Sequence, residues 1–320
     1  MAFHTPYNSG CPVSSIPWQA LTHVVQVGYQ PSSAGTLTDF SPGDTSALIQ
    51  SAHSSGVKVL AEISDATGGD FHSAVTGNLA QLVSNVMAVV NTNGYDGVSV
   101  DWESNVTVSE LVTLLTALRS ALGSRLLVAA SIVTQHTQWN ATNTAMLDRL
   151  FVMTYDMAST SDPYSWFLSA LYGTGTNDAV WSIDLAVKRF SASGVPLTRL
   201  NMGIPFYGAA STGGGITGPR QAYGTPFPTV TQIYYNNILP AYVTTNPNRD
   251  AVSGGSPWIS IPNGWLCFDD PISVKAKVQY VLDRGLGGFG VWDLSGDYVA
   301  AGTTTSEKHP LLNATMVGLQ

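Results

Sequence analysis

Short apolar runs alternate along the chain with longer amphipathic stretches. Eight runs are continuous or nearly continuous in apolar residues, which is typical of parallel strands that are buried on both faces. These predicted strands are residues 2–5, 23–29, 57–63, 97–103, 126–132, 150–155, 200–205 and 287–293. Between them lie helix candidates that are each followed by a glycine, a common left-handed helix end. The predicted helices are residues 45–55, 78–93, 109–122, 179–193 and 273–284.

Repeated β/α units over 320 residues predict one α/β domain, residues 1–320, folded as a TIM (β/α)8 barrel. The alternative is an open, doubly wound sheet. The segment 208–265 breaks the rhythm between strands seven and eight and is rich in Gly, Pro, Asn, Thr and aromatic residues. Because it follows the carboxyl end of a strand, we interpret it as a loop insertion on the catalytic face, not as a separate domain.

The composition argues against nucleic-acid binding, membrane association and metal binding. The formal net charge is −8, with 13 Lys and Arg against 21 Asp and Glu and no basic run, so nucleic-acid binding is not expected. No apolar stretch reaches the roughly 20 residues of a membrane span, so no membrane association is expected. The two cysteines lie far apart and the six histidines form no metal-binding pattern, so we expect no metal and no cofactor.

The surface is low in charge and rich in Ser, Thr, Asn and Gly, which favours a secreted, extracellular protein. No signal peptide is visible, and we interpret Met1 as a trimmed or introduced start. We expect a monomer. Cys11 follows strand one and Cys267 precedes the last helix. Strands one and eight are neighbours in a closed barrel, so a disulfide between these cysteines is an open alternative.

The predicted strand 97–103 carries the clearest chemistry. Alternate residues of a strand share a face, so Ser99, Asp101 and Glu103 point the same way. Two carboxyl groups inside a barrel repel one another and are poorly solvated, which raises at least one pKa above its usual value of about 4. A carboxyl group that keeps its proton near neutral pH is what a general acid needs. The competing interpretation is a pair of solvated loop residues past a strand end.

The segment DGVSVDWE, from Asp96 to Glu103, resembles the DGxDxDxE signature of glycoside hydrolase family 18. Three further stretches resemble motifs of that family in the correct order. They are FVMTYD at 151–156, MGIPFYG at 202–208, and CFDDPIS with GLGGFGVW at 267–273 and 285–292. The resemblance spans nearly the whole chain and implies a chitinase-like enzyme that cuts N-acetylglucosamine polymers on a TIM barrel.

The resemblance also implies a retaining mechanism in which the substrate's own 2-acetamido group is the nucleophile. Glu103 would protonate the glycosidic oxygen and later activate water. Asp101 would orient the acetamide N–H, and Tyr155 would hydrogen-bond the acetamide oxygen. Asp156 would contact the distorted sugar and tune Glu103.

Further residues are expected to bind the sugar chain. The resemblance implies that Trp292 forms the floor of the sugar site, since an aromatic face packs well on a pyranose. Tyr207 and Met153 are expected to line the site. Trp166 is expected to be an exposed aromatic on the leaving-group side. Weaker candidates of the same kind are Trp139, Trp258 and Trp265.

The chain departs from the family in two motifs. Ser99 replaces the middle Asp of the strand-four signature, and Glu62-Ile-Ser-Asp65 stands where the family has SxGG on strand three. We hypothesise an exchange in which Glu62 supplies the carboxylate that Ser99 lacks and shares a proton or a hydrogen bond with Asp101. The alternative is that Ser99 is a damaging change and Glu62 points elsewhere.

Three functions remain open. The first is an endo-acting chitinase on chitin and chitooligosaccharides. The second is an endo-β-N-acetylglucosaminidase on N-glycans, which would use the same site. The third is a weakly active or inactive chitin-binding lectin, which the loss of an acid at Ser99 keeps open although Glu103 is present.

Overall fold

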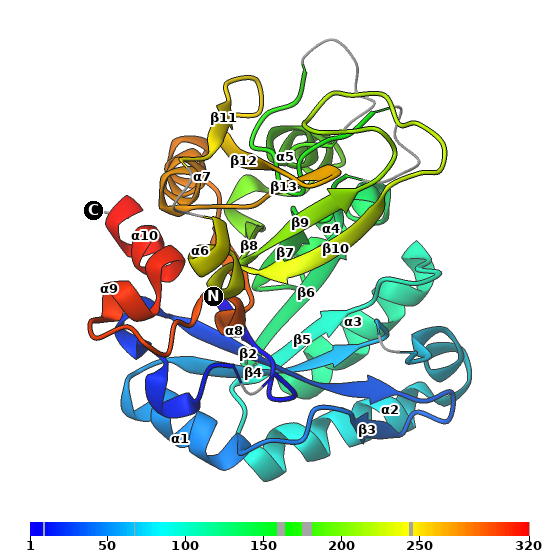
Figure 1. The fold of residues 1–320 in the computed structure, drawn as a ribbon. Helices are drawn as coiled ribbons and strands as arrows, with labels where there is room; N and C mark the ends of the chain where they lie inside the picture. Colours follow the sequence, from blue (N-terminus) through cyan, green and yellow to red (C-terminus); the bar gives the residue numbers. More distant parts are fainter. Residues whose placement is uncertain (9, 67, 159–163, 175–180, 243–245, 320) are drawn as a thin grey trace. The chain divides into compact units, whose positions relative to one another are not determined.

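The main sheet of the protein is a closed ring of parallel strands. The computed structural model describes residues 1–320 except 9, 67, 159–163, 175–180, 243–245 and 320. The strand order is β1-β14-β8-β7-β6-β5-β4-β2, an additional pairing of β1 with β2 completes the ring, and β3 extends it beside β2 (Figure 1). The fold is therefore the predicted (β/α)8 barrel, and the open sheet is excluded.

The eight predicted strands all form, with ends that shift by a few residues. They are β1 (Ala2–His4), β2 (His23–Pro31), β4 (Lys58–Ser64), β5 (Gly97–Asp101), β6 (Leu126–Ile132), β7 (Arg149–Met153), β8 (Leu200–Pro205) and β14 (Gly288–Trp292). The short strand β3 (Leu37–Asp39) pairs antiparallel with β2. The strand predicted over 97–103 ends at Asp101, so Glu103 lies in the loop that follows it.

The α-helices are α1 (Thr45–Ser54), α2 (Phe71–Asn93), α3 (Val108–Leu122), α4 (Ala141–Thr144), α5 (Ile183–Ala192), α6 (Tyr235–Tyr242), α7 (Pro271–Arg284), α8 (Leu294–Asp297), α9 (Thr305–Lys308) and α10 (Pro310–Gly318). Helices α1, α2, α3 and α7 begin at side-chain caps and end at or near a predicted glycine. Short 3₁₀ helices span Val13–Ser15, Trp18–Ala20, Val133–Gln138 and Leu197–Arg199.

Helix α2 begins earlier than its sequence pattern predicts. The Asp70 side chain accepts the Ser73 N–H and starts the helix seven residues before the predicted start at Asn78. Asn78 itself has non-helical dihedral angles, φ −140° and ψ 31°, and marks a kink. By length and mean hydropathy, 1.3 over its most apolar window, α2 is long and apolar enough to cross a membrane. This differs from the expectation of no such stretch, but a core helix passes the same test.

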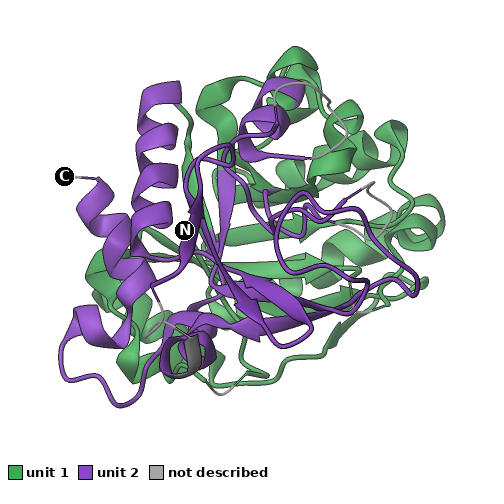
Figure 2. Ribbon diagram, turned by 45° about the horizontal axis from the view of Figure 1, so that its top comes forward, with its two compact units in different colours: residues 1–152, 190–201, 286–290 green, residues 153–189, 202–285, 291–320 purple. Residues whose placement is uncertain are grey.

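The chain divides into two compact units (Figure 2). Unit 1 comprises residues 1–152, 190–201 and 286–290, and unit 2 comprises residues 153–189, 202–285 and 291–320. Unit 1 holds the parallel strands β1, β2, β4, β5 and β6, with one shift of register between β2 and β4, at Gln26 to Tyr29. Its core is built from branched aliphatic side chains of these strands and from the apolar faces of α1, α2 and α3.

Unit 2 contains the insertion predicted at 208–265. This segment forms an antiparallel sheet of five strands in the order β10-β9-β13-β12-β11. The strands are β9 (Tyr207–Thr212), β10 (Thr229–Tyr234), β11 (Asn248–Asp250), β12 (Ser256–Ile261) and β13 (Gly264–Cys267). The insertion is thus regular structure, where the sequence suggested a loop.

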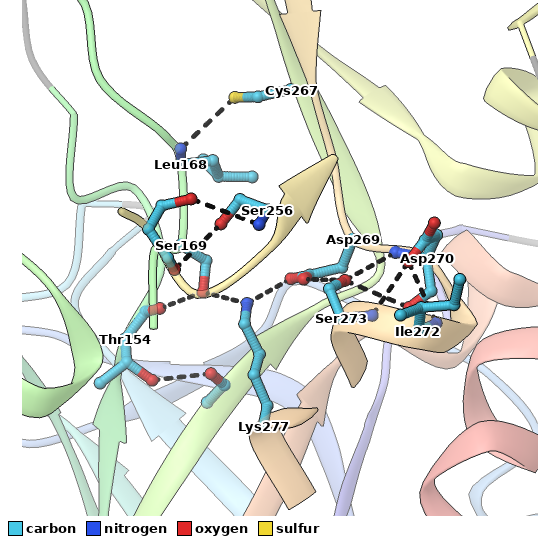
Figure 3. A network of polar contacts seen from close by, with 12 residues as sticks. Thr154, Leu168, Ser169, Ser256, Cys267, Asp269, Asp270, Ile272, Ser273 and Lys277 are labelled. Atoms are coloured by element: carbon cyan, nitrogen blue, oxygen red, sulfur yellow. Dashed lines mark hydrogen bonds and ion pairs between the residues drawn. The ribbon is translucent and has the colours of Figure 1, made fainter. Parts of the chain in front are cut away.

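A buried polar network supports unit 2 beneath this sheet (Figure 3). The Lys277 Nζ donates to Asp269 Oδ2 at 2.5 Å and to Ser169 Oγ at 2.7 Å. Ser169 Oγ in turn donates to the Thr154 carbonyl oxygen at 2.6 Å. Lys277 is only 2% exposed, so this ion pair is shielded from solvent.

Both cysteines are buried and unbridged. The disulfide between Cys11 and Cys267 that the barrel order left open is therefore absent. Burial raises the pKa of the Cys267 thiol to about 11.

Candidate active site

The site in unit 1 is a polar face shared by β4 and β5. Glu62 pairs in register with Ser99, and Ser64 pairs with Asp101. Residues that pair across parallel strands lie on the same face, and so do alternate residues of one strand. Two carboxyl and two hydroxyl groups therefore meet on one buried surface, and none of the four residues is more than 6% exposed.

Both carboxyl groups hold their protons unusually tightly. Burial raises the pKa of Asp101 to about 8, the negative charge of Glu103 adds to the rise, and a hydrogen bond from Ser64 opposes it. Burial, followed by the charges of Asp101 and Glu103, raises the pKa of Glu62 well above its usual value. Among the ion pairs of the described residues, none includes Glu62 or Asp101. Both raised pKa values favour protonated carboxyl groups near neutral pH.

The structure supports only part of the proposed exchange between Glu62 and Ser99. A carboxyl group does stand on β4 directly opposite Ser99, beside Asp101. However, Asp101 Oδ2 accepts its hydrogen bond from Ser64 Oγ, at 3.1 Å, and not from Glu62. Within the described residues, Ser99 Oγ and Asp101 Oδ1 are buried without a hydrogen-bond partner. The charge of Asp101 thus helps to raise the pKa of Glu62, while Ser64, which the sequence did not single out, makes the direct contact with Asp101.

Glu103 follows the strand by two residues and is half-buried. Its backbone is held by side chains on both sides. Asp65 accepts the Glu103 N–H at 2.7 Å, and Gln135 Nε2 donates to the Glu103 carbonyl oxygen at 2.9 Å. Glu103 thus lies past the strand end, as the interpretation of solvated loop residues assumed, but its backbone is bound to buried side chains.

In unit 2, three predicted residues meet after β7. The rings of Tyr155 and Tyr207 lie edge to face, with centroids 6.1 Å apart. Asp156 has a left-handed backbone, with φ 52°, which is uncommon for a residue other than glycine. Desolvation raises the pKa of Asp156, and hydrogen bonds from the Tyr207 and Gln232 side chains partly oppose the rise.

Gln232 is a site residue that sequence reasoning missed. It lies on β10, paired in register with Ala209, and its Nε2 donates to Asp156 Oδ1 at 3.1 Å. The predicted insertion therefore contributes a contact to the predicted site residue Asp156. Only a tertiary contact reveals this role, since Gln232 sits in a polar stretch without a motif.

Two more predicted residues remain partly accessible in unit 2. Met153 ends β7 and is half-buried. Trp292 ends β14, is half-buried, and its carbonyl oxygen accepts the Phe206 N–H at 2.7 Å. Both side chains thus keep some exposed surface for a ligand.

The prediction of an exposed Trp166 is wrong. Its side chain is 2% exposed, packs against the Phe167 ring at 5.5 Å, and donates its indole N–H to the Trp181 carbonyl oxygen. The weaker candidates Trp139 and Trp265 are also buried, at 3% and 1% exposure, while Trp258 is partly exposed. An indole side chain combines a large apolar area with one hydrogen-bond donor. The buried Trp139, Trp166 and Trp265 therefore pack in the core, and the indole N–H groups of Trp139 and Trp166 donate to Ser131 and Trp181.

No group of three or more His, Cys, Asp or Glu side chains is placed to hold a metal ion in the part of the chain that the structure describes. The predicted site residues that the structure describes carry carboxyl, hydroxyl and aromatic side chains. A TIM barrel that places an acid cluster at the carboxyl ends of its strands is typical of a hydrolase that works by proton transfer.

The chain belongs to family 18 of the glycosyl hydrolases, whose profile matches residues 2–297. It is 26% identical to chitotriosidase-1 of Mus musculus over 269 residues, which cover 75% of this chain and 57% of that protein. It is 27% identical to a probable endochitinase of Caenorhabditis elegans over 260 residues, which cover 72% of this chain and 42% of the relative. The chain thus spans about half the length of these curated relatives.

Solved structures share the fold. The Ostrinia furnacalis Group IV chitinase in complex with allosamidin superposes with a TM-score of 0.86 at 20% identity, covering 99% of this chain and 97% of that one. The chitinase RmChi1 of Rhizomucor miehei gives 0.86 at 24% identity, covering 100% and 99%. Human YKL-39, described as a pseudo-chitinase with retained chitooligosaccharide binding properties, gives 0.79 at 17% identity, covering 99% and 98%.

Proposed function

We propose that this protein is an endo-acting, retaining chitinase that hydrolyses β-1,4-linked N-acetylglucosamine polymers and oligomers. The observation that carries the proposal is the buried carboxyl pair of Glu62 and Asp101 beside the loop that holds Glu103. Family membership and the names of the relatives, chitotriosidase and endochitinase, support the substrate class.

In the proposed reaction, the Glu103 carboxyl donates its proton to the glycosidic oxygen as the bond from that oxygen to C1 breaks. The acetamide carbonyl oxygen of the sugar before the cut attacks C1 from the other face and forms an oxazolinium intermediate. Glu103, now a carboxylate, takes a proton from water as the water oxygen attacks C1. The acetamide is restored, and the product keeps the β configuration.

Asp101 is proposed to orient the acetamide and to stabilise its positive charge. Its Oδ2 accepts from Ser64, while its buried Oδ1 has no partner among the described residues and is available to accept the acetamide N–H. Tyr155 would donate to the acetamide oxygen, and Asp156 and Tyr207 would contact the distorted sugar. The ring of Trp292 would pack against the face of that sugar, and the Met153 side chain would line the site beside it.

The test compares the parent protein with Glu103→Gln on chitin oligomers and on a high-mannose glycopeptide. We expect the parent to release chitobiose and other short oligomers with the β anomer first. Loss of the proton donor should lower turnover by about 10²- to 10⁴-fold. The exposed Glu307→Gln is the matched control and should keep parental turnover, because Glu307 only binds Thr303 and Thr304.

Partly deacetylated oligomers examine the mechanism separately. If the substrate's acetamide is the nucleophile, cleavage after a sugar that lacks the acetyl group should be nearly absent. Cleavage there at the parental rate would contradict the substrate-assisted step and leave the chitinase assignment intact.

The same experiment decides between the remaining functions. Release of the glycan from the glycopeptide alone would favour an endo-β-N-acetylglucosaminidase. Binding of chitin oligomers without cleavage by either variant would favour a lectin, a function supported by Ser99 in place of an acid and by the pseudo-chitinase among the structural neighbours.

We also propose that the protein is a secreted monomer and that residues 208–265 belong to one catalytic domain. The contact of Gln232 with Asp156 supports the last point, because it joins the insertion to a site residue. Light scattering at micromolar concentration tests the monomer: a mass near 33.8 kDa supports it, and twice that mass contradicts it.

A further inference from the structure

The loop that carries Glu103 is clamped by one residue of the neighbouring strand end. Asp65, just after β4, donates its own N–H to the Asp101 carbonyl oxygen at 3.1 Å. Its two carboxylate oxygens accept the N–H groups of Glu103, at 2.7 Å, and of Ser104, at 3.0 Å. Three hydrogen bonds therefore join Asp65 to the backbone of Asp101, Glu103 and Ser104.

A second side chain completes the clamp from the other direction. Gln135 Nε2 donates to the carbonyl oxygens of Trp102, at 3.2 Å, and of Glu103, at 2.9 Å. The Gln135 amide is itself held by Ser131, which accepts the indole N–H of Trp139. Both peptide groups that flank the Glu103 side chain are thus bound to buried side chains, which limits the directions in which its carboxyl group can point.

Asp65 differs from Gln135 because it brings a charge. It is 6% exposed, and within the described residues it forms no ion pair. Burial raises the pKa of Asp65, while the N–H groups of Glu103 and Ser104 lower it by stabilising the carboxylate. Among the groups that raise the pKa of Asp101, the Asp65 charge adds to burial and to Glu103.

The clamp uses a side chain at a position where the chain departs from the family motif. The resemblance places a glycine of SxGG at position 65, and a glycine has no side chain to accept these two N–H groups. The exchange at strand three therefore has two parts, a carboxyl group inside the barrel at Glu62 and a second one at the strand end at Asp65.

We propose that Asp65 is a positioning residue for proton transfer: its carboxylate fixes the backbone of Glu103 and places a negative charge beside the acid cluster. The inference rests on the proposed function of Glu103. Asp65 does not contact substrate in this role and acts through Glu103 and Asp101.

Asp297 offers a matched control. Its carboxylate is also buried, at 0% exposure, and also accepts two consecutive backbone N–H groups, those of Leu311 at 2.9 Å and Leu312 at 2.8 Å. Change of either Asp to Asn leaves one acceptor oxygen and turns an amide N–H toward a backbone N–H. The two variants should therefore lose similar stability, and only one of them lies beside Glu103.

The first measurement is the pH dependence of kcat/KM on a soluble chitin oligomer. We expect Asp65→Asn to lower kcat by about tenfold with KM within a factor of two. Loss of the nearby negative charge lowers the pKa of the acid cluster, so the alkaline limb of the profile should move down by about half a pH unit. Asp65→Glu keeps the charge and should keep that limb. Asp297→Asn should keep both kcat and the limb.

The second measurement needs no turnover. Carboxyl-carbon NMR titration follows Asp101 directly, and its pKa should fall in Asp65→Asn and stay parental in Asp297→Asn. Amide hydrogen exchange at Glu103 and Ser104 should accelerate in Asp65→Asn. An unchanged Asp101 titration and unchanged exchange overturn the inference even if the protein is active. A parent without turnover but with both shifts present refutes the proposed function and leaves the clamp standing.

Discussion

Asp101 in unit 1 and Asp269 in unit 2 are both buried, at 6% and 4% exposure, but they are compensated in opposite ways. Asp269 is paired with the Lys277 ammonium at 2.5 Å, whereas Asp101 faces Glu62, Asp65 and Glu103 and holds one hydroxyl bond from Ser64. A buried charge with a cation can remain ionised, whereas a buried cluster of acids must keep protons.

Two other carboxyl groups of unit 2, those of Asp184 and Asp250, follow the pattern of paired charges. Asp184 contacts Lys188 and Arg284, and Asp250 contacts Arg220. Burial alone would raise the pKa of each, but the cations and hydrogen bonds lower both below the usual range. The difference shows that a neighbouring cation, more than the degree of burial, decides whether a buried carboxyl group is a structural carboxylate or can carry a proton.

The largest expected effect comes from removing the cation of the Lys277–Asp269 ion pair. Lys277→Met should lower the free energy of unfolding by about 3–5 kcal/mol, because it leaves Asp269 as an uncompensated buried charge. Urea denaturation at pH 7 measures the change. The double variant Lys277→Met with Asp269→Leu should regain most of the loss. A double variant as unstable as the single one would show that packing, and not the charge, is responsible.

The next effect is the pH dependence of stability. The pKa of Asp101 is about 8 in the folded protein and about 4 in the unfolded chain, so the folded state binds more protons between these values. Stability contributed by this group is complete below about pH 4 and is lost as the pH rises through about 8. The loss is at most about 1.4 kcal/mol per pH unit.

Denaturation of the parent at pH 5, 6.5 and 8 should therefore show falling stability, and Asp101→Asn should flatten the curve. Asp250→Asn is the contrasting control. The pKa of Asp250 is lowered, so its contribution is lost only as the pH falls below about 4, and the slope between pH 5 and 8 should stay parental.

A smaller effect separates activity from stability at Glu62. Glu62→Gln should lower turnover on chitin oligomers by about tenfold, because the cluster loses one of its interacting acids. The same change should leave the free energy of unfolding at pH 8 unchanged or raise it by about 1 kcal/mol, since a buried acid is removed from a crowded site. The exposed Glu307→Gln sets the baseline for turnover. Parental turnover in Glu62→Gln would reduce Glu62 to a packing residue.

The smallest effect concerns the contact between the insertion and Asp156. Gln232→Ala removes the 3.1 Å hydrogen bond to Asp156 Oδ1. We expect kcat/KM to fall about threefold, which corresponds to the net value of about 0.5–1 kcal/mol for one such bond. Gln232→Glu would place two acids together and should be worse than Ala, mainly above pH 6. If both variants match the parent, the insertion does not support Asp156.

The barrel was predictable from the sequence because its signals are local and repeated. Each strand is an apolar run, and five glycines mark helix ends, so element order follows without tertiary knowledge. The start of α2 was not predictable in this way, because the cap at Asp70 precedes a kink at Asn78 that hides the continuous helix. The strands of the insertion were hidden because they are short and lie in a segment rich in Gly, Pro, Asn and Thr.

The site was predictable where a motif or strand parity marks a residue, as at Asp101. Residues that act through tertiary hydrogen bonds carry no such mark. Ser64, Gln135 and Gln232 are single polar residues whose partners are far away in sequence, up to 76 residues for Gln232 and Asp156. The error at Trp166 has a related cause, since residue type alone does not tell a buried indole from an exposed one.

The two unbridged, buried cysteines make this chain convenient for chemical labelling. The sequence contains two thiols in total, and they are 3% exposed at both Cys11 and Cys267, which hinders thiolate formation and access by a maleimide. A cysteine introduced at an exposed position such as Ser104 would therefore be modified selectively in the native state. A fluorophore attached next to Glu103 could then report directly on ligand arrival, without any prior removal of the native thiols.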